Sequence, residues 1–339
     1  MTDARHHPPP PAGALSSSTA VRHAELASVS SRQLVRELVA RMRDGGVWTS
    51  DDDMAMLGAW LVRAIEKQND LHHNRFSLQR YHDLFLQYLA LQPRPPIRGA
   101  TIVDAGCGGI NPWGFSFLFL ALGAARGFAI DLEEIRDQSM AAQALADLAA
   151  AMLLDPKRLV GEMAIDPHEV LRNLASFDLA RLRAGDPAGV DGSRLAYLRE
   201  GATAISLPDA TADLVFSIAF LEHPADPAAV VREFARITKP GGQGCHVIDL
   251  SDHRAYAGGG HPLQFLTEPG PGMAHGSNRL RASEWAALFA ASGFEIVQQR
   301  VFRTVALPPE VRRALAPPFA SMCEADLTTA SINLSVRRR

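Results

Sequence analysis

The stretch ATIVDAGCGGINPWGFSFLFLALGAARGFAIDLE, residues Ala100 to Glu133, contains the pattern that decides the fold. Its apolar start, Ala100 to Val103, predicts a buried strand of a parallel sheet. The turn from Asp104 to Gly109 follows at once, and its glycines allow a sharp bend and close approach of a ligand to the backbone. The apolar residues from Trp113 to Leu122 then predict a helix.

A second short apolar strand, Gly127 to Ile130, ends in the carboxylate of Asp131. Two strands that end in acids beside a glycine-rich turn indicate a nucleotide-type site at the carboxyl ends of parallel strands. The glycine spacing differs from the dinucleotide fingerprint, and the turn lacks the lysine of a phosphate loop. An acid before the glycines, Asp104, would repel a pyrophosphate and suits a positively charged ligand. A tight turn without any ligand is the alternative.

The composition is that of an ordinary globular protein. The chain has 339 residues and a net charge of -3, so no overall basic excess indicates nucleic acid. Its three cysteines are far apart, which disfavours a disulfide framework. We expect no membrane span and no signal peptide, and therefore a cytoplasmic location.

Three parts are predicted along the chain. Residues 1–20, which include a proline run and a serine run, predict a disordered tail, and residues 21–97 predict a helical cover for the substrate pocket. Residues 98–339 predict the main domain, with an insertion at about residues 155–192 that sits over the site. His73, in the helical part, is a candidate substrate-binding residue. Simple core packing of the helical part is the alternative.

Strands and helices alternate through the main domain. We predict strands at residues 195–198, 214–218 and 244–248, and helices at residues 138–154 and 227–237. This order predicts an α/β fold, a doubly wound and mostly parallel sheet. Two further strands, at residues 294–302 and 327–336, have no crossover between them, which implies an antiparallel edge pair.

Two local signals refine these boundaries. Residues Lys239 to Gly242 predict a turn that leads into the strand at residues 244–248. Ser283 predicts the start of a further helix, and Gly293 its end.

A second pattern lies between Leu207 and Gly242. It consists of Leu207, Pro208, Asp209, Asp213, Val215, Leu221, His223, Asp226, Glu233, Arg236, Lys239, Pro240, Gly241 and Gly242. Together with the glycine-rich turn, it resembles the class I S-adenosylmethionine-dependent methyltransferases of the small-molecule type. The resemblance covers about residues 98–338. It implies a Rossmann-like sheet of seven strands with the last strand antiparallel, and S-adenosyl-L-methionine as cofactor.

The resemblance also implies a role for each position. The cofactor would contact Asp104, Ala105, Gly106, Gly108, Asp131, Leu132, Ala202, Thr203, Ser217 and Ile218. Asp131 would accept hydrogen bonds from both ribose hydroxyls, and Leu132 would pack on the adenine. The family often carries an aspartate after the third strand, where this chain has Gly201-Ala202-Thr203. The main chain or Thr203 must then hold the adenine amino group, or the adenine is held differently.

Candidate catalytic groups lie in the segment HVIDLSDHR, residues 246–254. Asp249 stands at the carboxyl end of the predicted strand, and His253 is the candidate base. Asp252, its neighbour, would hold the imidazole in the required tautomer. Asp252 and His246 are also candidate substrate-binding residues. In the alternative, the aspartates cap a turn, His253 is a surface residue and His246 belongs to the core.

Residues outside this segment supply further candidates. Beside Glu222, His223 is a second candidate base, although the family pattern explains this histidine as well as catalysis does. Arg279 would hold an anionic substrate or pair with surface acids. We expect no metal, and a site built from His246, Asp249 and His253 is the alternative.

The predicted function is methyl transfer to a small-molecule acceptor, to a hydroxyl of a sugar or secondary metabolite. The alternatives are N- or C-methylation, and a non-catalytic S-adenosylmethionine-binding scaffold or partner subunit. A nucleic-acid methyltransferase is disfavoured by the charge balance and by the absence of an N-P-P-Y type motif after the fourth strand. We expect a monomer or homodimer with no nucleic-acid or membrane partner.

Overall fold

A computed structural model describes residues 78–91, 94–257, 260–269, 272–273 and 275–339. A seven-stranded sheet forms the centre of this described part of the chain. The predicted tail and most of the predicted helical cover, His73 included, lie outside the described residues. The strand order is β3-β2-β1-β4-β5-β7-β6. The strands are β1 Thr101–Ala105, β2 Arg126–Asp131, β3 Leu195–Arg199, β4 Ala212–Ile218, β5 Thr238–Asp249, β6 Phe294–Thr304 and β7 Thr329–Arg338. β7 is antiparallel to both of its neighbours and the other pairs are parallel, which confirms the predicted fold.

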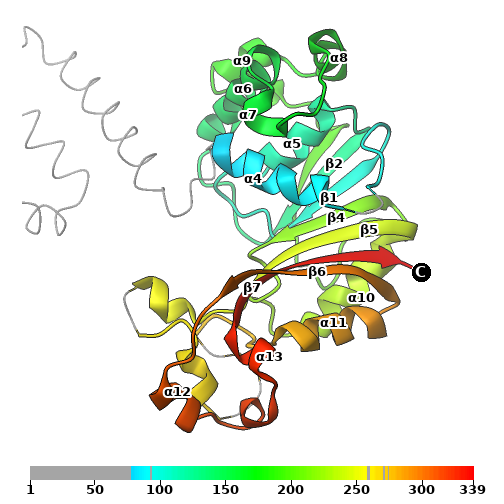
Figure 1. The fold of residues 1–339 in the computed structure, drawn as a ribbon. Helices are drawn as coiled ribbons and strands as arrows, with labels where there is room; N and C mark the ends of the chain where they lie inside the picture. The colour runs from blue at the N-terminus through cyan, green and yellow to red at the C-terminus, as the bar shows by residue number, and fades with distance from the viewer. Residues whose placement is uncertain (1–77, 92–93, 258–259, 270–271, 274) are drawn as a thin grey trace, which may run out of the picture. The chain divides into compact units, whose positions relative to one another are not determined.

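Helices cover both faces of this sheet (Figure 1). On one face α4 (Leu78–Leu89), α5 (Gly114–Ala121) and α6 (Gln138–Leu154) share a core with alternate residues of β1 and β4. On the other face α10 (Pro227–Ile237) and α11 (Ala282–Ala291) pack with the intervening residues and with β7. None of the helices in the described ranges is long and apolar enough to cross a bilayer.

The sequence determines α10 locally. Asp226 accepts a hydrogen bond from the amide of Ala229 at 2.8 Å, and Pro227 suits the first turn. Val230, Val231 and Phe234 then repeat at helical spacing and are buried against the sheet. This helix fixes the position of the loop between β4 and α10, which contains His223.

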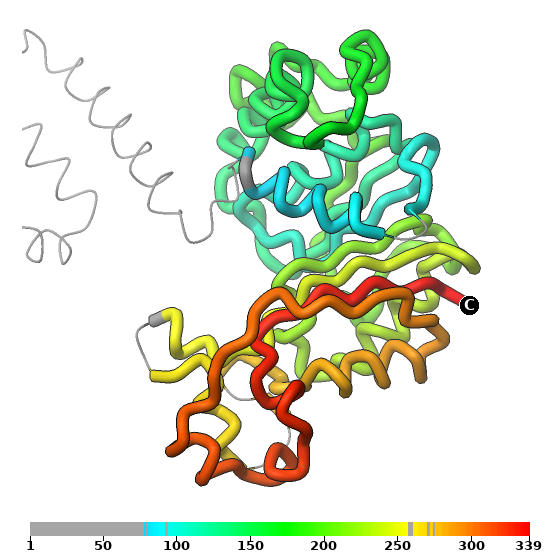
Figure 2. Tube along the Cα trace, viewed as in Figure 1, coloured from blue at the N-terminus to red at the C-terminus, as the bar shows by residue number. Residues whose placement is uncertain are grey.

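The predicted insertion lies on the helical layer. It contains α7 (Lys157–Val160), α8 (Pro167–Asn173), α9 (Leu179–Arg183) and the short helix η2 (Pro187–Gly189). These segments contact α4, α5 and α6, and the tube trace shows the same arrangement (Figure 2). Its apolar residues are buried against those helices, and the expectation that the insertion sits over the site stays a prediction.

Two predicted boundaries differ from the structure. The turn at Lys239 to Gly242 is part of β5, since the pairing with β4 continues across it with a register shift. Helix α11 begins after Arg281, so Ser283 is not its cap. The Ser283 hydroxyl instead donates a hydrogen bond to Asp326 at 2.5 Å.

A small C-terminal lobe, residues 250–281 and 305–328, lies at the carboxyl end of β5. It consists of η3 (His253–Ala257), η4 (Gln264–Thr267), α12 (Pro309–Arg313), η5 (Phe319–Ser321) and α13 (Glu324–Thr328). The lobe has its own apolar cluster, which includes Phe265, Leu307 and Phe319. The fully buried Arg281 donates hydrogen bonds to the carbonyls of Leu250, Asp326 and Thr329, and so ties the lobe to the edge of the sheet.

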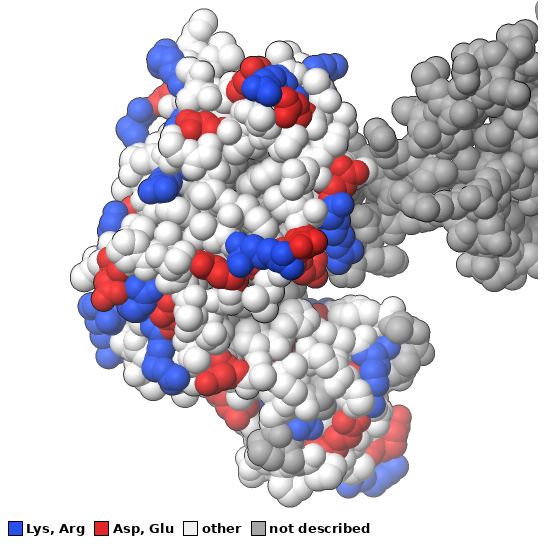
Figure 3. Space-filling model, turned by 180° about the vertical axis from the view of Figure 1, so that it is seen from behind, with Lys and Arg blue, Asp and Glu red and all other residues white. Residues whose placement is uncertain are grey.

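The surface carries both signs of charge. On the face drawn in Figure 3, basic and acidic side chains are interspersed on the main body and on the lobe. Several of them are paired, as in the contact between Arg312 and Glu324 at 2.5 Å. This face therefore shows no continuous basic track among its described residues.

Candidate active site

The turn after β1 is held by main-chain hydrogen bonds to the end of β2. The amides of Gly106 and Cys107 donate to the carbonyl of Ile130 at 2.8 and 3.3 Å. Gly106 and Gly108 both have a φ of +75°, a conformation that favours glycine. A Cβ at Gly106 would also overlap the ring of Phe220, which follows β4. Gly106 is therefore needed both for its backbone angle and for space.

Asp131 ends β2 beside this turn. Its Oδ2 accepts from the amide of Gly108 at 2.7 Å, and its Oδ1 accepts from the amide of Glu133 at 3.0 Å. Each carboxylate oxygen has a further lone pair, so both can still accept a ribose hydroxyl. The adjacent Leu132 is 70% exposed and offers an apolar surface of the kind on which an adenine can pack.

The loop after β3 lies near this surface. Gly201 lies against Leu132, Ala202 is half-buried and Thr203 is exposed. The contact of the adenine with the main chain of this loop or with the Thr203 side chain stays a prediction.

A cavity of about 20 Å³ lies between the glycine-rich turn, the end of β4 and helix α4. Its lining residues are Arg80, Tyr81, Leu84, Asp104, Gly106, Cys107, Asn111, Phe115 and Ile218. Such a volume holds about one water molecule, so the methionine part of a cofactor needs side chains of the lining to shift. The structure thus brings α4, the last helix of the predicted cover, to Asp104 and Ile218.

Ser217 and His246 are part of the core on the α10 face of the sheet. This position differs from the predicted contacts of Ser217 with the cofactor and of His246 with the substrate. The Ser217 hydroxyl is 2.8 Å from Nδ1 of His246, so it points away from the expected methionine site. The imidazole is fully buried, with ring centroids 5.5 Å from Phe234 and 4.8 Å from Phe289. Burial lowers the pKa of His246 to about 3. His246 is therefore a core residue, and its assignment to substrate or metal binding was wrong.

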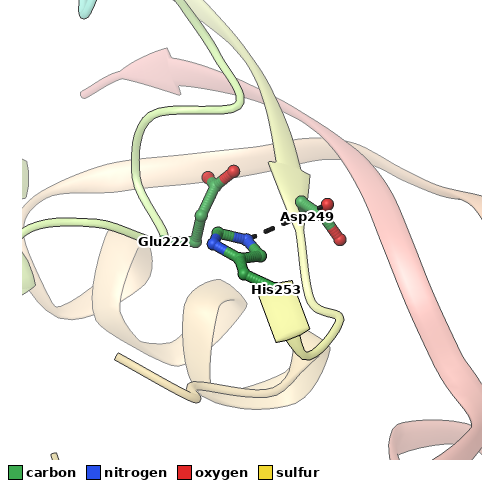
Figure 4. Close-up of side chains that lie close together, drawn as sticks. All are labelled: Glu222, Asp249 and His253. Atoms are coloured by element: carbon green, nitrogen blue, oxygen red, sulfur yellow. Dashed lines mark ion pairs between the residues drawn. The ribbon is translucent and has the colours of Figure 1, made fainter. Parts of the chain in front are cut away.

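Glu222, Asp249 and His253 converge at the carboxyl ends of β4 and β5 (Figure 4). One carboxylate or imidazole atom from each lies within 4.8 Å of the others. Nε2 of His253 is 4.0 Å from Oδ2 of Asp249. Glu222 is 2% exposed, and its Oε2 has no hydrogen-bond partner in the part of the chain that the structure describes. We call these three residues the carboxylate–histidine cluster.

Two further side chains border the cluster. The His223 ring lies 5.1 Å from the His253 ring, and its Nδ1 is 2.9 Å from the carbonyl of Gly276. His223 is half-exposed, with Nε2 4.0 Å from Oε1 of Glu222. The Tyr256 hydroxyl donates a hydrogen bond to Oδ2 of Asp249. Both predicted imidazoles are therefore close together at the mouth of the cluster.

Burial determines the protonation of these groups. It raises the pKa of the Glu222 carboxyl to about 8, and the charge of Asp249 adds to this effect. Burial also lowers the pKa of His253, with Asp249 opposing the change. At neutral pH the Glu222 carboxyl is therefore mostly protonated, and the His253 imidazole is mostly neutral and able to accept a proton.

Asp252 does not hold His253 as the sequence led us to expect. Its buried carboxylate binds Arg254, with the closest contact 2.5 Å long. Arg254 also binds Glu268 at 2.6 Å. The side chains of the successive residues Asp252 and His253 point in different directions. Asp249, and not Asp252, faces His253. The substrate-binding role of Asp252 was therefore wrong as well.

Arg279 lies inside the C-terminal lobe. It is 6% exposed, and its guanidinium donates to the carbonyls of Gly272 and Glu268 at 2.8 and 3.3 Å. These contacts give Arg279 a structural role in place of the predicted one. Sequence reasoning also missed Tyr256, Arg80 and Tyr81 at the site, because their spacing from the motifs gives no signal.

A family model described as "Methyltransferase domain" matches residues 157–245. The matched segment contains β3, β4, α10 and most of β5, and it begins after the glycine-rich turn and Asp131. No curated protein matches the chain.

Several solved structures are similar to this chain. An S-adenosylmethionine-dependent methyltransferase from Mesorhizobium loti has 20% identity and a TM-score of 0.40, and the match covers 74% of this chain and 97% of that one. One from Methanosarcina mazei has 14% identity and a TM-score of 0.37, with 73% and 95% covered. A phosphoethanolamine N-methyltransferase from Haemonchus contortus, bound to S-adenosylhomocysteine, has 13% identity and a TM-score of 0.39, with 74% and 52% covered.

The strand order with antiparallel β7, the acid-glycine turn after β1 and the acid after β2 define a Rossmann-like methyltransferase domain. The matched family model agrees with this fold, since it describes residues 157–245 as part of a methyltransferase domain. S-adenosylmethionine is its cofactor. The residues fit this cofactor at the glycine cradle and at Asp131, whose oxygens can accept from a ribose.

Proposed function

We propose that this methyltransferase transfers the methyl group to a hydroxyl of a small molecule, such as a sugar or secondary metabolite. The observation that carries this proposal is the carboxylate–histidine cluster. Glu222 follows Ile218, which lines the cavity beside Asp104, by four residues. The cavity and the cluster therefore lie at the same edge of the sheet, where the parallel strands β1, β4 and β5 end.

The reaction is an in-line displacement. A lone pair of the acceptor oxygen attacks the methyl carbon, the bond from carbon to sulfur breaks, and its electron pair neutralises the sulfonium. Alignment of the reactants supplies roughly 7–11 kcal/mol of the barrier reduction. The hydroxyl proton passes to Nε2 of His253, and Asp249, whose Oδ2 is 4.0 Å from that atom, stabilises the imidazolium that forms. General base catalysis contributes about 10²–10⁴-fold.

We also propose that residues 21–97 cover the acceptor pocket. α4, the described part of this segment, supports the idea because Arg80, Tyr81 and Leu84 line the cavity. The acceptor would then lie between α4 and the C-terminal lobe. A small-molecule partner, without nucleic acid or membrane, is part of this proposal.

An assay with labelled S-adenosylmethionine tests the function. The full chain is incubated with a panel of hydroxylated metabolites, and the thioether product S-adenosylhomocysteine is measured with and without each one. We expect product only when a hydroxylated acceptor is added. Tight cofactor binding without turnover on any acceptor would favour the scaffold alternative, and transfer only to amines or carbon acids would favour N- or C-methylation.

A further inference from the structure

The carboxylate–histidine cluster contains a buried acid whose polar atoms are not all satisfied by the described residues around it. Two carboxylates lie beside one imidazole, and the Glu222 side chain is 2% exposed. Its Oε2 has no hydrogen-bond partner among the described residues, and one oxygen of the same carboxyl group lies at the cluster. A buried carboxylate oxygen without a partner is costly, because it loses its hydration and gains nothing in return.

Nearby cationic side chains are engaged elsewhere or lie at the edge. Arg254 binds Asp252 and Glu268. Arg281 donates to main-chain carbonyls. Arg303 is 41% exposed, and its contact with Oδ1 of Asp249 is 3.6 Å long. None of these three arginines has a contact with Glu222 in the described structure that could balance its charge.

We propose that Glu222, Asp249 and His253 form a binding site for a divalent cation. The ligands would be one oxygen of each carboxylate and Nε2 of His253, whose mutual distances of up to 4.8 Å allow a single ion to lie between them. Two oxygen ligands and one imidazole favour Mn²⁺ or Mg²⁺, with the remaining positions open to water or to an acceptor oxygen.

The surroundings of Asp249 fit a ligand role. Its Oδ1 accepts from the amide and hydroxyl of Ser251 at 2.9 and 2.6 Å, and its Oδ2 accepts from the Tyr256 hydroxyl. Such hydrogen bonds fix the orientation of a ligating carboxylate and leave lone pairs for an ion. Glu222 is held by burial. The two carboxylates are thus positioned before any ion arrives.

This inference rests on the proposed function for what the ion would do. A bound cation lowers the pKa of a coordinated hydroxyl, so that the acceptor loses its proton more readily. The cation and a proton compete for Nε2 of His253. With the cation bound, the half-exposed His223, whose ring lies 5.1 Å from that of His253, would be the imidazole left to take the acceptor proton.

Cation binding is tested directly, without turnover. The full chain is stripped with EDTA, dialysed and titrated with Mn²⁺, and free Mn²⁺ is followed by electron paramagnetic resonance. We expect one bound Mn²⁺ per chain, displaced by Mg²⁺ in excess. Glu222→Gln and Asp249→Asn, which preserve shape, should each weaken binding at least tenfold. Glu310→Gln, an exposed carboxylate on α12, is the matched control and should bind as the parent does.

Failure of the parent to bind Mn²⁺ at millimolar concentration would overturn the proposal, as would unchanged affinity in both cluster variants. Circular dichroism and cofactor affinity verify that each variant is folded, and the parent titration stands even if a variant is not. Methyl transfer that survives EDTA, in a chain that binds no Mn²⁺, would keep the proposed function and reject the ion. Mn²⁺ binding without transfer to any acceptor would keep the ion and reject the function.

Discussion

The two halves of the candidate active site are held together in different ways, one through the main chain and the other through side chains. On the cofactor side, the amides of Gly106 and Gly108 and the carboxylate of Asp131 make hydrogen bonds that involve the main chain. On the acceptor side, Glu222, Asp249 and His253 meet through their side chains alone. Motifs record main-chain geometry well, because glycine and acid positions are fixed by the turn that they form. Side-chain convergence depends on the packing of distant segments.

The largest expected effect concerns the acceptor side. His253→Ala should lower turnover by about 10²–10⁴ under either role of the imidazole, as base or as cation ligand. Cofactor affinity, measured by calorimetry, should stay within a factor of about two, because His253 does not line the cavity at Asp104. His168→Ala, an exposed histidine on α8, is the control and should be fully active. A loss below about threefold would mean that alignment alone drives the reaction.

Asp131→Ala should affect the cofactor side instead. The carboxylate is placed to accept two charge-assisted hydrogen bonds from the ribose, each worth about 1.5–3 kcal/mol. Affinity for S-adenosylmethionine should fall at least about tenfold by calorimetry in a protein that is still folded. Asp147→Asn, an exposed acid on α6, should bind as the parent does. Unchanged affinity would remove Asp131 from the site.

Gly106→Ala tests whether the turn itself is the cofactor element. Its φ of +75° and its closeness to the Phe220 ring should cost about 1–3 kcal/mol of stability or cofactor affinity. Phe220→Ala in the same chain should restore part of that loss, since it removes the overlap and leaves the backbone angle. Calorimetry and urea unfolding measure both effects. If the effects of Gly106→Ala and Phe220→Ala simply add, the Phe220 ring does not restrict the residue at position 106.

The smallest expected effect is a pH dependence of stability, which tests whether His246 is a core histidine or an active-site histidine. Since the folded-state pKa of His246 is lowered to about 3, only the unfolded chain takes up this proton between about pH 6.5 and 3. The free energy of unfolding should therefore fall as the pH drops through this range, by at most about 1.4 kcal/mol per pH unit. The double variant Ser217→Ala/His246→Phe should lose this dependence, as urea unfolding between pH 4 and 7 would show. The same slope in parent and variant would contradict the assignment.

Much of the fold could be predicted from the sequence. The helices at Gln138–Leu154 and Pro227–Ile237 have the predicted bounds, because helix-forming residues and the Asp226-Pro227 start mark them locally. β5 begins earlier than predicted, since a backbone with Gly241 at a φ of +78° still pairs with its neighbour. Glycine spacing indicates a turn but not whether the sheet continues through it.

The site was predictable on one side only. Sequence placed Asp131 and the glycines at the turn and strand end where the structure has them, but it joined His253 to Asp252, its neighbour in the chain. In the structure Asp249 faces the imidazole, because the turn after β5 reverses the chain within four residues. The burial of Glu222 also gave no signal, since it arises from packing between the β4 loop and the lobe. The burial of Glu222 therefore belongs to no local segment.

Arg281 has a consequence for how this protein can diversify. Its guanidinium binds carbonyl oxygens of Leu250, Asp326 and Thr329, which are present whatever side chain occupies those positions. An anchor of this kind tolerates substitution of the residues around it. Under the proposal that the acceptor lies beside the C-terminal lobe, the lobe can exchange its acceptor-facing side chains while its attachment to the sheet stays the same. Acceptor preference is then the property most open to change, in evolution or by loop grafting, with the methyl-donor half untouched.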